Sequence, residues 1–443
     1  MMYKEVQLTH DHSGHCTNSS HCFSPDDQWI VYDSRNDDGG IMGAGEIAMV
    51  NIRSEEITSL YKTENQTAFG PGVGAVSFSP VADRVIFIHG IRNANKEKPY
   101  SFTRRTGVAI EVSKPFVPVF MDARTIVPPF IPGALRGGTH AHCWSGDGQW
   151  LSFTYNDYLL EQLEKQGKPV RDLRTVGVMV TGHPVIVKDD GSFENNSGSC
   201  FSFLLAEVTD HPVPGSDEIE KAFDEGWIGK NGYHKGDGSM QRLAIAFQGN
   251  VRDADGAIKT EIFIADIPED ILEAAVAEPA GNDPSRRPRV PRGVKTRRIS
   301  FTKRGVSPKP RHWLRSTTDG NLVGFLAADD QGLIQLFGIS SLDGSIRQLT
   351  NNSFSIQGPF NFSPDDKFAA YSGDNAVWIT EIDNGRTVRV SERFSDEEKP
   401  DGSIVWSNNG SMICYNRRVK AGQHKNDPAG FLQIFLINLS ENT

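Results

Sequence analysis

The stretch Arg136–Asp157, RGGTHAHCWSGDGQWLSFTYND, contains the pattern that decides the fold. A strand that begins around Cys143 and Trp144 is followed by the polar turn SGDG and by a second apolar strand, QWLSFTY. A turn rich in Ser, Asp and Gly between two such runs is typical of a β-hairpin. The first half of the stretch carries His140 and His142. Because side chains two residues apart in extended chain point to the same side, the two imidazoles could face one ligand or one metal.

The same unit recurs along the chain. Its copies are HCFSPDDQWIVYDSRND from His21, AVSFSPVADRVIFIHG from Ala75, HWLRSTTDGNLVGFLAADD from His312, FNFSPDDKFAAYSGD from Phe360 and IVWSNNGSMICYNRR from Ile404. Most copies are followed by a third and a short fourth strand, and the unit repeats at a spacing of roughly 45 to 65 residues. Four antiparallel strands per repeat indicate a propeller blade. The sequence therefore predicts an all-β protein, a seven-bladed propeller with WD40-like blades that forms one domain over residues 1–443.

Two end segments predict how the ring closes. The first, YKEVQLT from Tyr3, resembles a fourth strand with no blade before it, and the last, AGFLQIFLINL from Ala429, resembles a third strand with no fourth after it. We expect residues 4–9 to pair beside residues 431–439, because closure removes the exposed edge of the sheet.

Two helical insertions are predicted. The first is YLLEQLEKQGKP, directly after Asp157. The second covers residues 216–225, where Ile219 and Phe223 stand at helical spacing and should be buried, with Glu220 and Asp224 exposed. In this interpretation the insertion follows SCFSFLLAEV, taken as the first strand of blade four.

Composition excludes several partners. The net charge of −10 argues against a general nucleic-acid or anionic-membrane surface, and we interpret the basic stretch PSRRPRVPRGVKTRR as a solvated loop. No stretch of the sequence is apolar enough to span a membrane, and the N-terminus lacks an apolar signal region. We therefore expect a cytoplasmic protein.

Histidines stand at the starts of several innermost strands, which converge on the central channel of a propeller. His140, His142 and His312 with Gln357 are the predicted ligands of a divalent metal, since neutral imidazole suits first-row metals. Whether His21 joins them is left open. The alternative is that each histidine caps a strand or bonds a loop backbone.

Loops on the same face add candidates for chemistry. His89 is the candidate base, and Arg136 is expected to act with it by neutralising a substrate carboxylate. Arg35, Asp157 and Arg315 are the predicted substrate-binding residues. The alternative is that these charged residues form surface salt bridges.

Four stretches carry a resemblance to a known family. They are LRGGTHAHCWSGDGQWLSFTYND, PGSDEIEKAFDEGWIG, PRHWLRSTTDG and IQGPFNFSPDD, and together they resemble the YidR family of uncharacterised, TolB-like bacterial propellers. More distantly, the repeats are similar to oligogalacturonate lyase, a cytoplasmic seven-bladed propeller that binds a divalent metal such as manganese through three histidines and a glutamine. That family has a Gln three residues before its HxH pair, whereas this sequence has Gly137, so the amide ligand has to come from another blade.

Two hypotheses of function follow. The first is a metal-dependent lyase that cleaves a small uronate or oligogalacturonate-like sugar acid by β-elimination at the central channel. The second is a scaffold without catalytic activity, similar to TolB, whose face binds a protein or a small ligand. The fold alone cannot choose between them.

Overall fold

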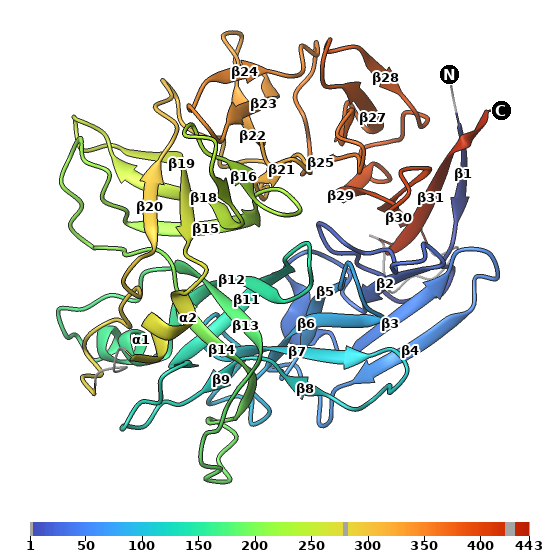
Figure 1. Cartoon of the computed structure of the whole chain (residues 1–443). Helices are drawn as coiled ribbons and strands as arrows, with labels where there is room; N and C mark the ends of the chain where they lie inside the picture. The colour runs from blue at the N-terminus through green and yellow to red at the C-terminus, as the bar shows by residue number, and fades with distance from the viewer. Residues whose placement is uncertain (1–2, 278–281, 421–429, 443) are drawn as a thin grey trace.

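The computed structural model describes residues 3–277, 282–420 and 430–442. In these residues seven sheets of three or four antiparallel strands follow one another around a ring, as the colours of Figure 1 show. The predicted seven-bladed β-propeller is confirmed.

The blades are formed by consecutive strands. Blade one consists of β2 (Trp29–Asp33), β3 (Glu46–Asn51) and β4 (Ile57–Lys62). Blade two consists of β5 (Val73–Phe78), β6 (Arg84–Gly90), β7 (Arg105–Glu111) and β8 (Val119–Phe120). Blades three and four consist of β11 (Gly137–Trp144), β12 (Trp150–Asp157), β13 (Thr175–Val185), β14 (Gly198–Leu204), β15 (Lys221–Trp227), β18 (Leu243–Arg252), β19 (Ile258–Ile267) and β20 (Lys295–Arg298).

The remaining blades continue the pattern. Blades five and six consist of β21 (Arg315–Ser316), β22 (Leu322–Ala328), β23 (Ile334–Ser340), β24 (Ile346–Gln348), β25 (Asn361–Phe362), β26 (Phe368–Gly373), β27 (Ala376–Glu381) and β28 (Thr387–Arg389). Blade seven consists of β29 (Pro400–Trp406), β30 (Met412–Val419), β31 (Phe431–Asn442) and β1 (Tyr3–Gln7). Two small pairs lie outside the blades: β9 (Ala123–Arg124) with β10 (Ala134–Leu135), and β16 (Tyr233–His234) with β17 (Met240–Gln241).

A repeated turn explains why the serine-rich motif marks several of the blades. In blade three the hydroxyl of Ser145 donates to Asp147 at 2.6 Å and accepts from the backbone N–H of Trp150 at 3.0 Å. The same pair of bonds recurs in blade six, where Ser363 donates to Asp365 at 2.6 Å. Such side-chain bonds fix the turn between the two inner strands of a blade.

The ring closes as predicted. Strand β1 pairs antiparallel with β31, with Glu5 opposite Ile437 and Gln7 opposite Phe435, and Figure 1 shows the two termini side by side. Leu8 is buried in a hydrophobic cluster that joins blades one and seven. The closing strand therefore adds packing as well as backbone hydrogen bonds.

The prediction for residues 216–225 is wrong. Residues 221–227 form β15, the innermost strand of blade four, while β14, predicted to open this blade, is the outermost strand of blade three. Ile219 is buried as expected, but Asp224 is also buried and Phe223 is partly exposed. The reason is a bulge between Phe223 and Gly226, where Asp224 has a φ of 50°. A bulge interrupts the two-residue alternation, so the apolar spacing imitated a helix.

The helices are short. Helix α1 (Tyr158–Lys165) confirms the first predicted insertion, and the side chain of Asp157 caps it by accepting the N–H groups of Leu159 and Leu160. The others are α2 (Ile271–Ala277) and the 3-10 helix η1 (Gly40–Gly43). Among the described residues, no helix has the length and apolar character needed to cross a membrane.

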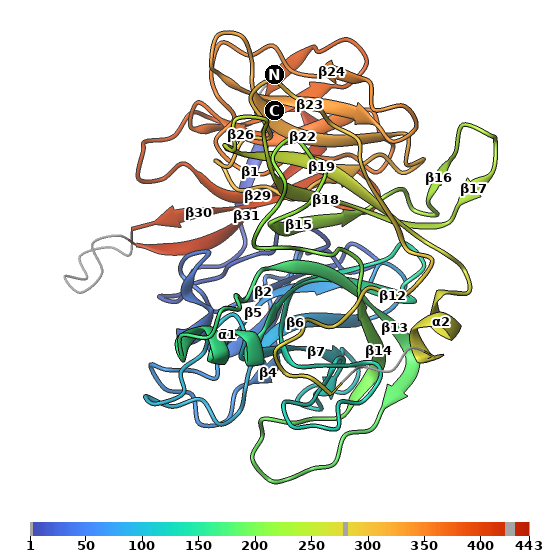
Figure 2. The same ribbon diagram turned by 90° about the vertical axis from the view of Figure 1, so that its left-hand side faces the viewer.

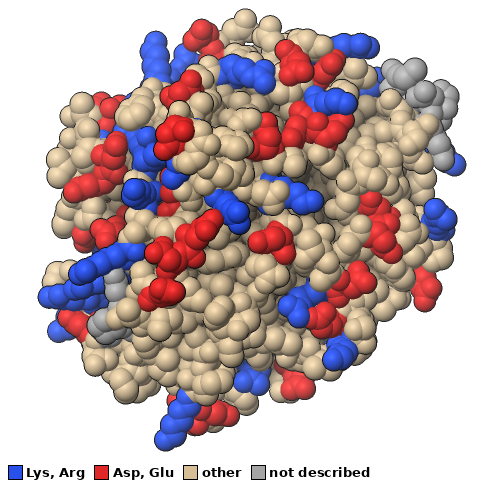
Figure 3. Space-filling view, viewed as in Figure 1, with Lys and Arg blue, Asp and Glu red and all other residues tan. Residues whose placement is uncertain are grey.

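The face of the molecule seen in Figure 1 is mixed in charge. Figure 3 shows basic and acidic side chains interspersed over the face seen in Figure 1. Figure 2 shows the β16–β17 hairpin extending from the edge of the ring.

Candidate functional site

The central channel contains two connected cavities. The upper chamber, of about 240 Å³, lies where the innermost strands begin and is lined by Arg35, Arg105, His140, His142, Arg174, Glu225, Arg311 and Arg315, among others. The lower chamber, of about 510 Å³, lies at the turns after these strands and is lined by Trp144, Trp227, Trp406 and neighbouring residues. Cys143 and Arg315 line both chambers, so the cavities meet there.

The structure places His140 and His142 in the upper chamber, as the sequence predicted. Both are buried, and burial lowers the pKa of His142 to about 3 and that of His140 well below its ordinary value. Nε2 of His142 lies 3.0 Å from the hydroxyl of Thr139, which itself donates to Asp122. His142 is therefore a donor at Nε2. Within the described chain, Nδ1 of either histidine has no hydrogen-bond partner.

The other two predicted metal ligands lie elsewhere. The backbone N–H of Leu326 donates to Nε2 of His312 at 3.1 Å, and Nδ1 of His312 lies 3.0 Å from the carbonyl of Pro310. Both ring nitrogens are thus occupied, which leaves no lone pair for a metal. Gln357 is exposed, and its amide bonds Asn375.

The four side chains therefore do not form the predicted ligand set. Among the residues that the structure describes, no group of three or more His, Cys, Asp and Glu side chains is arranged to hold a metal ion. The donors present do not fit the three-histidine and one-glutamine site that the resemblance implied. We derive no chemistry from a metal at this position.

The predicted catalytic pair also lies outside the chamber. Nδ1 of His89 lies 2.5 Å from the carbonyl of Gly90, and Nε2 lies 2.9 Å from the hydroxyl of Tyr61 on β4, so its ring is held between blades one and two. Arg136 donates to Asp157 at 2.7 Å in a buried ion pair. The first interaction joins two neighbouring blades and the second lies in blade three, and neither predicted role is supported by the geometry.

The predicted substrate-binding residues are divided. Asp157 belongs to the ion pair with Arg136 and does not line the chamber. Arg35 lines it, but its guanidinium is bound to both carboxylate oxygens of Asp33 at 2.6 and 2.9 Å. Arg315 lines it and is held by neutral partners, the amide oxygen of Asn361 at 2.8 Å and the hydroxyl of Ser19 at 3.0 Å. Of the three, Arg315 is the best placed to meet an anion.

Arg105, Arg174 and Arg311 also line the chamber and were missed by the sequence analysis; Arg311 is paired with Asp224, whereas the other two are not paired with an acid in the described chain. Arg105 donates to the hydroxyl of Tyr100 at 2.9 Å, but its Nε and its second terminal nitrogen have no partner among the described residues. Arg174 donates to the amide oxygen of Asn156 at 3.1 Å. Burial lowers the pKa of Arg105 and, with the charge of Arg105 nearby, lowers that of Arg174 to about 10. The ring of Phe102 lies 4.8 Å from the guanidinium carbon of Arg105 and 5.0 Å from that of Arg174.

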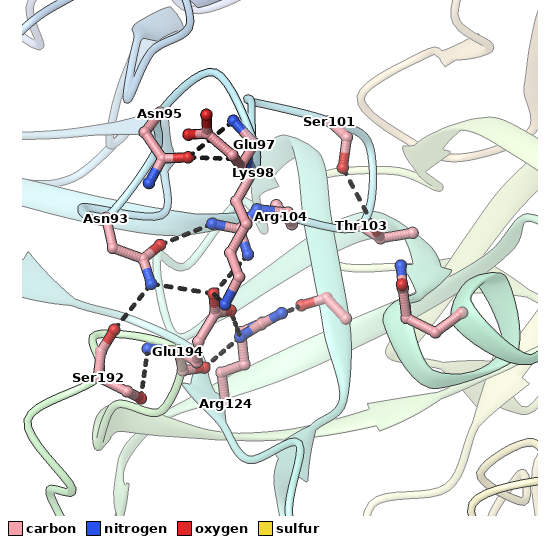
Figure 4. A network of polar contacts seen from close by, with 12 residues as sticks. Asn93, Asn95, Glu97, Lys98, Ser101, Thr103, Arg104, Arg124, Ser192 and Glu194 are labelled. Carbon is pink, nitrogen blue, oxygen red and sulfur yellow. Dashed lines mark hydrogen bonds and ion pairs between the residues drawn. The ribbon is translucent and has the colours of Figure 1, made fainter. Parts of the chain in front are cut away.

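A buried polar network holds the loop that carries Tyr100 and Phe102. Figure 4 shows Asn93, Lys98, Arg104 and Arg124 gathered around Glu194. Arg104 donates to one carboxylate oxygen of Glu194 at 2.5 Å, and Arg124 donates to the other at 3.2 Å. The network ties residues 91–104, between β6 and β7, to the loop after β13. It therefore fixes one wall of the chamber.

Glu225 is a further residue of the chamber that sequence reasoning missed. It lies on β15 and is almost fully buried at 1% exposure. The hydroxyl of Thr154 donates to its Oε2 at 2.7 Å. The incorrect helix prediction hid this residue, because a helix on the outside of the ring cannot contribute to the channel.

His21 does not join the two histidines of the upper chamber. It lines the lower chamber, with a φ of 53° that turns the chain into blade one. Burial and the nearby charge of Arg315 lower its pKa to about 4, so its ring is neutral at physiological pH.

Comparisons with known proteins agree with this architecture. A family model described as a protein of unknown function, DUF3748, matches residues 72–194, which include the loop 91–104 and β11. An oligogalacturonate lyase in complex with manganese has a TM-score of 0.53 at 10% identity, covering 99% of this chain and 93% of that chain. An oligogalacturonate lyase from Vibrio parahaemolyticus has a TM-score of 0.50 at 10% identity, covering 98% of this chain and 93% of that chain. These two structures share the fold.

A sequence relative is much closer. The uncharacterised protein YidR of Escherichia coli strain K12 is 34% identical over 415 residues, which span 92% of this chain and 94% of the relative. Identity at this level over nearly the whole length shows common family membership: the chain belongs to the YidR family.

Proposed function

We propose that the upper chamber binds a small sugar acid through its carboxylate. The observation that carries the proposal is that Arg105, Arg174 and Arg315 line one cavity, and that none of them forms an ion pair with a carboxylate in the described chain. A buried guanidinium without a counter-charge is costly, and a bound carboxylate removes that cost through charge-assisted hydrogen bonds.

The shape and lining of the chamber suit a ligand of sugar size. Its volume of about 240 Å³ is below the roughly 300–1,000 Å³ typical of sites for drug-sized molecules. Tyr100, Phe102 and Trp313 supply ring surfaces, while His140 and His142 supply neutral polar groups. The lower chamber continues beyond Arg315, which gives room for a second sugar unit.

We further propose that the bound sugar acid undergoes β-elimination. Support comes from the chemistry of the lining, since arginines that neutralise a carboxylate make the adjacent C–H bond more acidic. The two lyases of similar fold are named for oligogalacturonate, which contains the same functional groups. No step of this proposal uses a metal ion, because two of the four predicted ligands are held by other partners.

Calorimetric titration with matched ligands tests the binding proposal. We expect galacturonate to bind, and its neutral methyl ester and galactose to bind about tenfold or more weakly, because they lack the charge that the arginines recognise. Affinity for galacturonate should also fall as salt is added. Equal affinities for the acid and its ester would contradict the proposal.

The reaction has its own assay. Incubation with digalacturonate should raise the ultraviolet absorbance as an unsaturated uronate forms. Binding of galacturonate without any product from digalacturonate would favour the alternative of a propeller that only binds its ligand.

A further inference from the structure

Glu225 differs from the other acidic residues near the upper chamber. The hydroxyl of Thr154, on β12 of the neighbouring blade, donates to its Oε2, whereas its Oε1 has no hydrogen-bond partner in the described part of the chain. The carboxyl group is thus fixed at one oxygen and left without a partner at the other, in a cavity with a surplus of arginines.

Three carboxylates of the surrounding blades are paired with arginine. Asp33 binds Arg35 at 2.6 Å, Asp157 binds Arg136 at 2.7 Å, and Asp224 binds Arg311 at 2.6 Å. Glu225 has no such ion pair among the described residues, although it directly follows Asp224 in the chain. An ion pair would hold a carboxylate ionised and make it a poor proton acceptor, so the absence of one matters for chemistry.

The charged and titratable groups around Glu225 come from several elements. They are Asp224 on the same strand, Arg311 and Arg315 from the start of blade five, and Cys143 on β11. Burial raises the pKa of Glu225 to about 7, with a further increase from Asp224, while the Thr154 hydrogen bond and Arg311 act in the opposite direction. A carboxyl group whose pKa is held near 7 by these opposing effects can accept and release a proton near neutral pH.

We infer that Glu225 is the catalytic proton-transfer residue of the upper chamber, and that it acts on the C–H bond next to the carboxylate of a bound sugar acid. This inference rests on the proposed function. His142 is a weaker candidate because its buried imidazole has a pKa of about 3 and therefore a low affinity for protons.

The proposed step balances as follows. The carboxylate of Glu225 takes the hydrogen at C5 as a proton, and the electron pair of the C–H bond forms the C4–C5 double bond. The C4–O4 bond breaks, O4 leaves with its electron pair, and it takes a proton from water. Glu225 then releases its proton to solvent, so no oxidant or reductant is needed.

Hydrogen exchange at C5 of galacturonate, followed by NMR in deuterated water, tests the inference without requiring cleavage. Wild type should exchange this hydrogen for deuterium, and Glu225→Gln should exchange it at least about a hundredfold more slowly because the amide cannot accept the proton. Glu225→Asp should retain part of the rate. Circular dichroism of each variant checks that the propeller is folded.

A second measurement is independent of turnover. Titration of galacturonate at pH 7 in two buffers of different ionisation enthalpy reports proton uptake, because a bound carboxylate makes ionised Glu225 less favourable. Wild type should take up a fraction of a proton per ligand, and Glu225→Gln should take up none.

The outcomes separate the two proposals. If galacturonate fails to bind, the proposed function is contradicted and the inference falls with it. If galacturonate binds but its C5 hydrogen does not exchange in wild type, or exchanges equally fast in Glu225→Gln, then binding stands and the role of Glu225 is overturned.

Discussion

Arg104 and Arg105 are adjacent in sequence, yet they belong to two different environments. Arg104 reaches Glu194 in the buried network of Figure 4, which also holds Arg124. Arg105 turns to the upper chamber, where two of its guanidinium nitrogens have no partner among the described residues. Both side chains are buried, so burial alone does not distinguish them.

The same contrast separates Asp224 from Glu225. The carboxylate of Asp224 accepts hydrogen bonds from two guanidinium nitrogens of Arg311, while the carboxyl group of Glu225 accepts a hydrogen bond from the hydroxyl of Thr154. Each pair consists of neighbours of equal charge, one engaged by an opposite charge and one not. The difference teaches that a buried charged side chain in an ion pair with an opposite charge supports the fold, whereas a buried charged side chain without such an ion pair is available to a ligand.

A substitution in the polar network around Glu194 should have the largest effect on the free energy of unfolding. Replacing Glu194 with Gln keeps the shape of the side chain but leaves Arg104 and Arg124 without their charge partner. We expect the free energy of unfolding to fall by about 3–5 kcal/mol. Urea denaturation measures this change, and a loss below about 1 kcal/mol would show that the network is not structural.

On the chamber side, Glu225→Gln should change how stability depends on pH. The folded protein raises the pKa of Glu225 from its ordinary 4.5 to about 7, so it binds this proton more tightly than the unfolded chain does. Glu225 therefore contributes stability to wild type that is lost as the pH rises from 4.5 to 7, and the variant lacks this contribution. The stability of the variant relative to wild type should increase by up to about 3 kcal/mol across that window.

Urea denaturation of wild type and Glu225→Gln at pH 5 and pH 8 measures the difference between their free energies of unfolding. Groups that titrate equally in both proteins do not contribute to this difference. A constant difference would mean that Glu225 is ionised at both pH values.

His312 offers a smaller test of the same distinction. Because its nitrogens bond the backbone of Pro310 and Leu326, His312→Ala should lower the free energy of unfolding by about 2–3 kcal/mol. The affinity of folded protein for galacturonate should not change, since His312 does not line the upper chamber. Weaker binding without loss of stability would reverse this assignment.

Much of the fold could be predicted because the turn in each recognised repeat is formed by residues that are close together in the sequence. Ser145 and Asp147 bond within a few residues, so the motif and the structure coincide in each clear repeat. The ring closure followed from two unpaired end strands. Strand β15 was missed because its bulge at Asp224 removes the alternation by which strands are recognised.

Less of the site could be predicted, since its residues come from five blades and share no motif. His140 and His142 were found because they stand together on one strand. His312 was chosen in place of its neighbours, but Arg311 and Trp313 line the chamber while His312 points into blade five. Arg105 and Arg174 carry no sequence signal, because what distinguishes them is the absence of an acidic partner in the folded chain.

The affinity of galacturonate for two arginine variants tests the central claim most directly. Arg105→Met removes a guanidinium from the chamber, and Arg104→Met removes its sequence neighbour from the network. Calorimetry should show that Arg105→Met weakens binding by about tenfold or more with stability retained. Arg104→Met should lose stability while the folded protein keeps its affinity. Equal effects of the two variants on binding, or no effect of Arg105→Met, would contradict the account.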